Sequence, residues 1–190
     1  MLFSKRIIDI VLSFIAIIVL IIPMLIIAIC IKLDSKGPIL FKQQRPGKDK
    51  KLFNIYKFRT MFIETPNVST EALGDPSVYI TKVGMFLRKT SLDEIPQIFN
   101  IFVGHMSIVG PRPGLFNQYE LISMRDKVNV NSIRPGLTGY AQVMGRDFIS
   151  DEQKVEYDKY YLDHMSLLFD FKILFLTAKG VIRSEGVRLS

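Results

Sequence analysis

The sequence predicts a mixed α/β protein, mainly helical, in which an apolar N-terminal membrane segment precedes a small domain containing a β-hairpin. Residues 10–31 are almost wholly apolar, which predicts the membrane segment. Two short β-like runs flank a polar turn, which predicts the hairpin. Much of the remaining chain has helical periodicity interrupted by glycine and proline. A length of 190 residues suits one domain with an appendage.

The composition indicates an anionic partner. The net charge of +7 is consistent with nucleic acid, anionic lipid or a phosphorylated substrate. Nucleic acid is the weakest of these, because the positive residues lie beside the apolar segment and not along one recognition helix. Cys30 is the single cysteine, which excludes an internal disulfide framework and a cysteine-based zinc site. His105 and His164 lack metal-motif spacing, so surface or packing roles are expected for both.

The apolar segment is long enough to enter or cross a bilayer, since a spanning helix needs roughly 20 residues. Lys5 and Arg6 precede it, and further lysines and arginines are frequent in residues 32–51. Positive charge on both flanks favours keeping both ends on the cytoplasmic side. Pro23 predicts a kink inside the segment. A helix that enters, bends and returns is therefore expected, although a spanning helix also tolerates proline.

The hairpin is predicted from residues 38–42 and 52–59, joined by the polar turn 45–50. Strand alternation places Lys57 and Arg59 on the same face of the second strand. This basic face could be a solvated surface attracted to anionic lipid. It could equally be a phosphate-binding face, and the local pattern does not decide between the two.

Residues 64–79 are polar and broken by proline and glycine, which predicts a loop. A helical pattern begins at Lys82 and is interrupted after Leu87. Residues 95–102 then give a second apolar helical face, with Pro96 early enough in that helix to cost little.

Two adjacent carboxylates, Asp93 and Glu94, occur in the motif of residues 90–97 (TSLDEIPQ). Ser91 followed by Glu94 three residues later matches a capping box, so a helix start alone would explain both acids. Arg88, just upstream, suggests a second explanation, in which acids lie among fixed cations as phosphate chemistry requires.

Arg112 lies between Pro111 and Pro113, so residues 107–114 are expected to form neither a regular helix nor a central strand. The prolines pre-set where the guanidinium points, and arginine suits bidentate phosphate contact. A rigid turn with an exposed arginine is the alternative. Residues 133–147 are rich in glycine but match neither common nucleotide-binding pattern.

Residues 151–165 are predicted to form a helix, and Ser166 to cap another that carries an apolar face. The aromatic rings of Tyr157, Tyr160 and Tyr161 could lie at the level of lipid headgroups or pack in the core.

The order of several short motifs is specific, although no single one is decisive. They are the apolar segment followed by residues 44–47 (QRPG), 56–61 (YKFRTM), 87–88 (LR), 91–97 (SLDEIPQ), 106–113 (MSIVGPRP), 134–136 (RPG) and 142–146 (QVMGR). This order closely resembles the bacterial sugar transferase family, the monotopic polyprenyl-phosphate phosphoglycosyl transferases. The similarity covers nearly the whole chain and is greatest to the small members that initiate capsule or glycan assembly.

The resemblance implies transfer of a sugar 1-phosphate from a UDP-sugar to polyprenyl (undecaprenyl) phosphate, with release of UMP. It also implies a re-entrant helix-break-helix in residues 1–36. Residues 37–190 would form a catalytic domain with amphipathic interfacial helices on the cytoplasmic face of the bacterial inner membrane. Related sequences commonly have serine before the hairpin proline, where this chain has Ile22.

By resemblance, Asp93 is the nucleophile that forms an aspartyl phosphosugar, and Glu94 assists as a base or helps to place the metal. Mg²⁺ is the expected cofactor, with Asp93 among its ligands. The residues expected to bind substrate or phosphate are Lys57, Arg59, Arg88, Arg112, Gln142 and Arg146.

The expected partners are the UDP-sugar, the polyprenyl phosphate and membrane lipid, without nucleic acid, and a homodimer is possible. The sequence does not identify the sugar; an N-acetylfucosamine type is suggested by the capsule-type resemblance alone. The main alternative is a non-enzymatic, membrane-anchored adaptor that binds anionic lipid through its basic hairpin. A membrane phosphatase acting on polyprenyl diphosphate is a further alternative.

Overall fold

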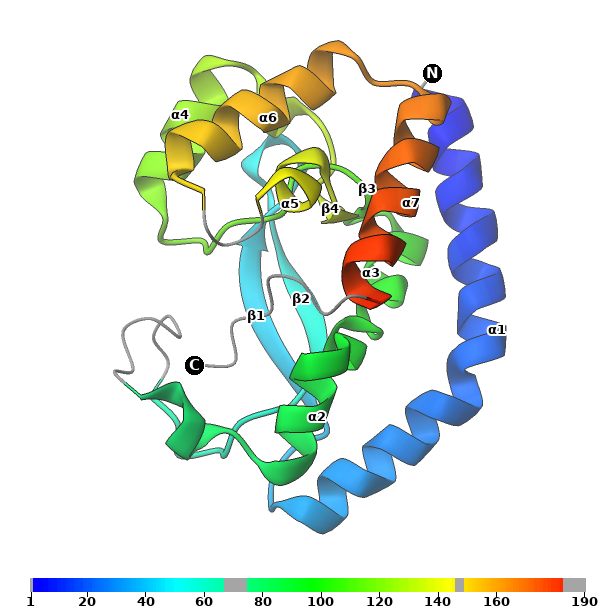
Figure 1. Cartoon of the computed structure of the whole chain (residues 1–190), viewed down its shortest axis with the longest axis vertical. Helices are drawn as coiled ribbons and strands as arrows, with labels where there is room; N and C mark the ends of the chain where they lie inside the picture. Colours follow the sequence, from blue (N-terminus) through cyan, green and yellow to red (C-terminus); the bar gives the residue numbers. More distant parts are fainter. Residues whose placement is uncertain (1, 67–74, 146–148, 183–190) are drawn as a thin grey trace.

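The chain folds into a long N-terminal helix beside a domain of short helices and two small sheets (Figure 1). The computed structural model describes residues 2–66, 75–145 and 149–182. The observed mixture of helices and short strands confirms the predicted mainly helical α/β class.

Helix α1 (Leu2–Asp34) contains Pro23 and remains continuous through it. Figure 1 shows that α1 bends along its length. The predicted helix-break-helix is therefore a bend in one helix, and not an interruption of it. Within the described ranges, α1 is the one helix long and apolar enough to cross a membrane. Only 11% of its most apolar stretch of 18 residues is buried against the rest of the protein.

The N-terminal part of α1 is held against the domain by buried polar contacts. Lys5 Nζ lies 2.5 Å from Asp170 Oδ2 in helix α7 (Leu167–Ile182), and the Tyr161 hydroxyl donates to the other Asp170 oxygen at 2.7 Å. One turn further along α1, the Asp9 carboxylate accepts a hydrogen bond from the Ile108 amide at 3.0 Å. Figure 1 shows α7 beside this part of α1.

The C-terminal end of α1 is attached to the same domain. The Asp34 carboxylate accepts from the Val83 amide at 3.1 Å, at the start of α2 (Lys82–Thr90). The Arg59 guanidinium donates to the carbonyl of Ser35 at 2.8 Å and also to that of Lys36. Both ends of the apolar helix are thus fixed to one body.

The predicted β-hairpin is present. Strands β1 (Leu40–Pro46) and β2 (Leu52–Phe58) pair antiparallel, and the short 3₁₀ helix η1 (Lys48–Lys50) lies in the turn. The turn is shorter than predicted, because residues 45 and 46 belong to β1. Side chains of β2 pack on helix α3 (Gln97–Val103) and the residues that follow it, with Phe53 and Ile55 in one core cluster with Ile101 and Met106.

The carboxylate motif folds differently from the predicted helix start. Ser91 ends α2 in the left-handed conformation, with φ 57°. The 3₁₀ turn η4 (Leu92–Glu94) follows, and Pro96 then precedes α3. The predicted capping box is wrong, because the Ser91 side chain makes no capping hydrogen bond. Ser91 is instead the C-terminal cap of α2. Asp93 and Glu94 therefore lie in the turn between two helices.

The predicted apolar face of residues 95–102 is only partly correct. Ile98 and Ile101 are the buried large apolar side chains of α3, whereas Phe99 and Phe102 are 40% and 38% exposed. The helix starts after Pro96, later than the start that the capping box at Ser91 predicted, and the proline therefore costs it no hydrogen bond.

Strand β3 (Ser107–Val109) pairs parallel with β4 (Gly136–Thr138). The strand stops before the two prolines, in agreement with the prediction for residues 107–114. The backbones meet closely at this end of the sheet, since a Cβ on Gly136 would lie 2.1 Å from the Gly110 nitrogen. Only glycine permits this approach.

The remaining elements are η3 (Pro76–Tyr79), α4 (Tyr119–Lys127), η5 (Val130–Ser132), α5 (Tyr140–Met144), α6 (Asp151–Asp163) and α7. Of these, α4 and α6 lie in the upper part of the domain in Figure 1, α5 lies near β4, and α7 lies beside α1. The predicted cap of the last helix is confirmed, because the Ser166 hydroxyl accepts from the Phe169 amide at 3.1 Å. Tyr161 is buried in a core cluster, whereas Tyr160 is 46% exposed. The loop predicted at 64–79 includes η3, and residues 67–74 lie outside the described ranges.

Candidate active site

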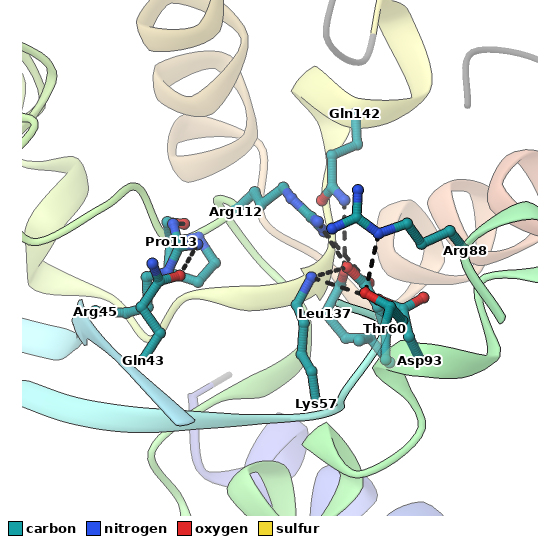
Figure 2. A network of polar contacts seen from close by, with 11 residues as sticks. Gln43, Arg45, Lys57, Thr60, Arg88, Asp93, Arg112, Pro113, Leu137 and Gln142 are labelled. Atoms are coloured by element: carbon teal, nitrogen blue, oxygen red, sulfur yellow. Dashed lines mark hydrogen bonds and ion pairs between the residues drawn. The ribbon is translucent and has the colours of Figure 1, made fainter. Parts of the chain in front are cut away.

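Two carboxylates and three cations from separate segments meet beside the hairpin (Figure 2). Asp93 and Glu94 come from η4, Lys57 from β2, Arg88 from the last turn of α2 and Arg112 from the loop after β3. These residues are far apart in the sequence, so the site depends on the complete fold of the domain.

Glu94 is the most strongly bound of the two acids. Its Oε1 lies 2.7 Å from Lys57 Nζ and 2.7 Å from Arg112 Nη2, and Oε2 lies 3.4 Å from Arg112 Nη1. Burial opposes ionisation of Glu94, but Arg112 and Lys57 outweigh it and lower the pKa of this carboxyl well below its usual range. Glu94 is therefore a fixed anion that holds two cations in place.

Asp93 has a different environment from its neighbour. Its side chain is 13% exposed, and its nearest ion-pair partner, Lys57 Nζ, lies 4.0 Å from Oδ2. Burial raises the pKa of Asp93 and the Glu94 charge adds to that rise, although Lys57, Arg88 and Arg112 oppose it. Within residues 2–66, 75–145 and 149–182, no group donates a hydrogen bond to this carboxylate. Its oxygens remain available to a ligand.

Arg88 lies near Asp93, as Figure 2 shows. Its Nε donates to the Thr60 hydroxyl at 3.0 Å, and burial lowers the pKa of this guanidinium while the Asp93 charge raises it. Among the described residues, Thr60 holds this guanidinium through Nε, which leaves the two terminal nitrogens for a phosphate.

Arg45 is a cation that the sequence analysis assigned to a turn and not to the site. Its Nη1 donates to the Pro113 carbonyl at 3.2 Å and its Nη2 to Gln43 Oε1 at 2.6 Å. Burial and the neighbouring Arg112 lower the pKa of Arg45 to about 10, with Glu94 acting in the opposite direction. Because the charges of Arg112 and Glu94 both act on Arg45, we count Arg45 among the cations of the site. Its sequence signal was the QRPG motif, in which the arginine ends a strand.

Together these residues give the site an excess of positive charge. In the part of the chain that the structure describes, the cations Arg45, Lys57, Arg88 and Arg112 surround two carboxylates. A ligand carrying two or more negative charges would balance this excess, and partial burial strengthens its attraction. A diphosphate fits this requirement.

Gln142, in α5, is a predicted substrate-binding residue for which no hydrogen bond with the two acids or the cations of the site is seen among the described residues. Its Nε2 donates to the Leu137 carbonyl at 3.4 Å, and its buried Oε1 has no protein partner in the described part of the chain. Figure 2 shows the amide pointing toward Arg88 and Arg112. Its role in substrate binding stays a prediction, supported by this orientation.

The structure places Arg59 differently from Lys57. Strand β2 ends at Phe58, so the alternation that predicted a shared face does not continue to Arg59. Its buried guanidinium binds the backbone at the end of α1. This geometry gives no support to the predicted phosphate contact. Arg146 lies outside the described residues.

The predicted Mg²⁺ site can be compared with the donors present. Among the described residues there is no group of three or more histidine, cysteine or acidic side chains that could hold a metal ion. Glu94 is occupied by its cations, but Asp93 could supply one oxygen ligand. Mg²⁺ commonly takes one or two carboxylates and completes its shell with phosphate oxygens and water. The residues fit a metal ion that arrives with a phosphorylated substrate.

A family model described as bacterial sugar transferase matches residues 1–184. The chain belongs to the bacterial sugar transferase family. The predicted resemblance is therefore confirmed, and the protein is a transferase by family.

Individual relatives agree with this assignment. The chain is 42% identical over 158 residues to the Bacillus subtilis protein named uncharacterized sugar transferase EpsL, covering 83% of this chain and 77% of that protein. It is 44% identical over 194 residues to the Escherichia coli UDP-glucose:undecaprenyl-phosphate glucose-1-phosphate transferase, covering 96% of this chain and 41% of the enzyme. An Aeromonas hydrophila UDP-N-acetylgalactosamine-undecaprenyl-phosphate N-acetylgalactosaminephosphotransferase is 37% identical over 194 residues, covering 98% of this chain. The chain spans less than half the length of these last two enzymes.

The opposite pKa shifts of the two acids lead to opposite effects on stability. Folding raises the Asp93 pKa, so at neutral pH the ionised Asp93 destabilises the fold, and Asp93→Asn should raise the unfolding temperature. Folding lowers the Glu94 pKa, so Glu94→Gln should lower the free energy of unfolding by about 1–3 kcal/mol. Thermal unfolding in detergent at pH 7.5 measures both.

Two comparisons sharpen this experiment. The gain from Asp93→Asn should disappear below the normal aspartate pKa, where the carboxyl is protonated in both states. The exposed pair of Lys159 and Asp163 provides a control, and Asp163→Asn should change stability by no more than about 0.5 kcal/mol. Destabilisation by Asp93→Asn at pH 7.5 would contradict the assigned environment.

Proposed function

We propose that this protein transfers a sugar 1-phosphate from a UDP-sugar to undecaprenyl phosphate, releases UMP and thereby initiates polysaccharide synthesis. The printed names of its relatives support the substrate classes. The observation that carries the proposal is the difference between the adjacent acids: Glu94 lies 2.7 Å from each of two cations, whereas among the described residues the closest ion-pair partner of Asp93 is Lys57 at 4.0 Å.

In the proposed first step, an Asp93 carboxylate oxygen attacks the β-phosphorus of the UDP-sugar. The bond from this phosphorus to the bridging oxygen breaks, and UMP leaves with the electron pair. Asp93 is then joined to the sugar phosphate as an acyl phosphate. In the second step, a phosphate oxygen of the polyprenyl phosphate attacks the same phosphorus and releases the carboxylate. Splitting the transfer lets the site handle the water-soluble donor and the membrane-bound acceptor in turn.

Both steps bring an anion toward an anionic phosphoryl group, so positive charge must offset the repulsion. Arg88, whose charge acts on Asp93 and whose Nε is held by Thr60, is assigned to the transferred phosphate. Lys57 and Arg112 face the same space and are held by Glu94. The lowered pKa of Glu94 makes it a weak base, so we assign it to holding these cations and not to removing a proton. The acceptor phosphate is largely ionised near neutral pH and needs no strong base.

A Mg²⁺ ion would supply further neutralisation of the diphosphate when bound. Asp93 is the residue proposed to ligate it. Arg88, Lys57 and Arg112 would then orient the donor so that its β-phosphorus faces the free Asp93 oxygen.

We also propose that α1 enters the membrane and returns, with both of its ends and the whole domain on the cytoplasmic face of the inner membrane. Two observations support this topology: the Lys5–Asp170 pair fixes one end of α1 to the domain, and the Asp34 and Arg59 contacts fix the other. Helices α2, α3 and α7 also expose large apolar side chains that could rest at the interface, namely Phe86, Phe99, Phe171 and Phe175.

The activity is tested with purified protein in detergent, Mg²⁺, undecaprenyl phosphate and a panel of UDP-sugars, measuring UMP. We expect catalytic UMP release with one or a few donors among UDP-glucose, UDP-galactose, UDP-N-acetylgalactosamine and an N-acetylfucosamine-type donor. Asp93→Asn should reduce turnover at least about 1,000-fold, because it removes the nucleophile. The matched control is Asp126→Asn, which removes an exposed carboxylate that pairs with Lys50 and should retain activity.

Other outcomes identify the alternatives. Release of inorganic phosphate from polyprenyl diphosphate without any UDP-sugar would indicate a phosphatase. Absence of turnover, combined with binding to anionic vesicles that falls as Lys48, Lys50 and Lys51 are removed, would indicate the lipid-binding adaptor.

The topology is tested by cysteine labelling in a Cys30→Ser background. Ser4→Cys and Lys36→Cys place one thiol near each end of α1, and Asp163→Cys marks the domain. A membrane-impermeant maleimide should label all three in inverted inner-membrane vesicles and none in intact spheroplasts. Labelling of Ser4→Cys alone in spheroplasts would show that α1 spans the membrane.

A further inference from the structure

The loop that carries Arg112 lacks the hydrogen bonds of a helix or strand beyond β3, yet its backbone is fully held. Prolines 111 and 113 have no amide hydrogen, so the carbonyls are the main backbone groups through which the loop can be fixed. All three accept hydrogen bonds from different elements. Gly136 N donates to the Pro111 carbonyl at 2.9 Å, Arg125 Nη1 to the Arg112 carbonyl at 3.0 Å, and Arg45 Nη1 to the Pro113 carbonyl at 3.2 Å.

The middle contact comes from a buried ion pair. Arg125, in the last turn of α4, is 6% exposed, and Asp158, in α6, is 1% exposed. Arg125 donates through Nε and Nη2 to Asp158 Oδ2, at 2.9 and 2.5 Å. Burying such a pair costs desolvation free energy that its own attraction does not always recover. We therefore consider what else the Arg125 guanidinium binds, which is the Arg112 carbonyl.

We infer that Arg125, oriented by Asp158, is a positioning residue that sets the backbone of Arg112 and so keeps the Arg112 guanidinium on Glu94. The expected effect of this positioning on the reaction rate rests on the proposed function. Through its guanidinium, Arg112 contacts Glu94 at 2.7 and 3.4 Å, while its carbonyl accepts the hydrogen bond from Arg125. A displacement of about 1 Å in such a group can cost about 100-fold in rate.

The geometry of Arg125 makes one variant especially informative. Its planar guanidinium uses one edge for Asp158 and the remaining terminal nitrogen for the Arg112 carbonyl. A lysine has a single nitrogen at the end of its chain and cannot reproduce this fork. Arg125→Lys therefore keeps the charge beside Asp158 while losing the paired contacts. Asp158→Asn keeps the shape but weakens the orientation of Arg125.

The experiment measures kcat and KM for the UDP-sugar in Arg125→Lys, in Arg112→Ala and in the double variant. We expect Arg125→Lys to lower kcat about 10- to 100-fold in the folded enzyme. In the Arg112→Ala background, the same change should have little further effect, because Arg125 acts through Arg112. Asp126→Asn, from the same helix, is the control and should leave kcat unchanged.

A purely structural role for Arg125 predicts a different result. Stability would fall while kcat per folded molecule would be retained in Arg125→Lys, both in the wild-type and in the Arg112→Ala background; this result overturns the inference. If Arg125→Lys does not fold, Asp158→Asn is measured in its place, with the same expected dependence on Arg112.

Hydrogen exchange gives a readout that does not require activity. In Arg125→Lys and in Asp158→Asn, amides of residues 112–118 should exchange faster, with little change in α7. Faster exchange in this loop together with an inactive wild-type protein would contradict the proposed function and leave the positioning role supported. An active wild type with unchanged exchange and unchanged kcat in the variants would overturn the positioning role alone.

Discussion

The structure of the site depends on one carboxylate, Glu94, shared between Lys57 and Arg112. This contact joins strand β2, the turn η4 and the loop after β3, which the chain otherwise connects only through distant segments. Without the shared anion, Lys57 and Arg112 would repel each other, and the loop would lose one of its attachments to the hairpin, leaving the Arg45 contact to the Pro113 carbonyl. Because Glu94 holds both cations closely, Lys57 stays 4.0 Å from the adjacent Asp93, and within the described ranges no hydrogen bond occupies the oxygens of this buried carboxylate. Two adjacent acids thus acquire different chemical properties from their contacts alone.

The surrounding structure keeps that arrangement rigid and places it beside the apolar helix. Three elements bind the carbonyls of residues 111–113. Helix α2 carries Arg88 to the site, and the first turn of α2 is bound by the Asp34 carboxylate of α1. Since both ends of α1 are tied to the domain, the proposed membrane embedding would hold the site close to the bilayer surface. A soluble nucleotide-sugar and a lipid phosphate could then reach the same aspartate, as the proposed covalent intermediate requires.

The sequence predicted the features that local patterns control. The hairpin, the apolar helix and the cap at Ser166 follow from periodicity and from the chemistry of single residues. The capping box at Ser91 failed because the end of α2 required that residue in the left-handed conformation. The interpretation of Arg59 depended on strand alternation that ends one residue earlier. The contacts of Arg45 and Arg125 could not be predicted from the sequence. Their partners, Pro113 and Asp158, lie 68 and 33 residues away along the chain and come close only when the chain folds.

The central claim is that Asp93, and not Glu94, bonds to the phosphosugar. The most direct measurement is mass spectrometry of the wild-type protein incubated with Mg²⁺ and its UDP-sugar without acceptor. The account predicts one sugar-phosphate adduct per protein, mapped to the peptide position of Asp93, with one UMP released and loss of the adduct when undecaprenyl phosphate is added. An adduct on Glu94, or full turnover with acceptor and no adduct under any donor, would contradict it.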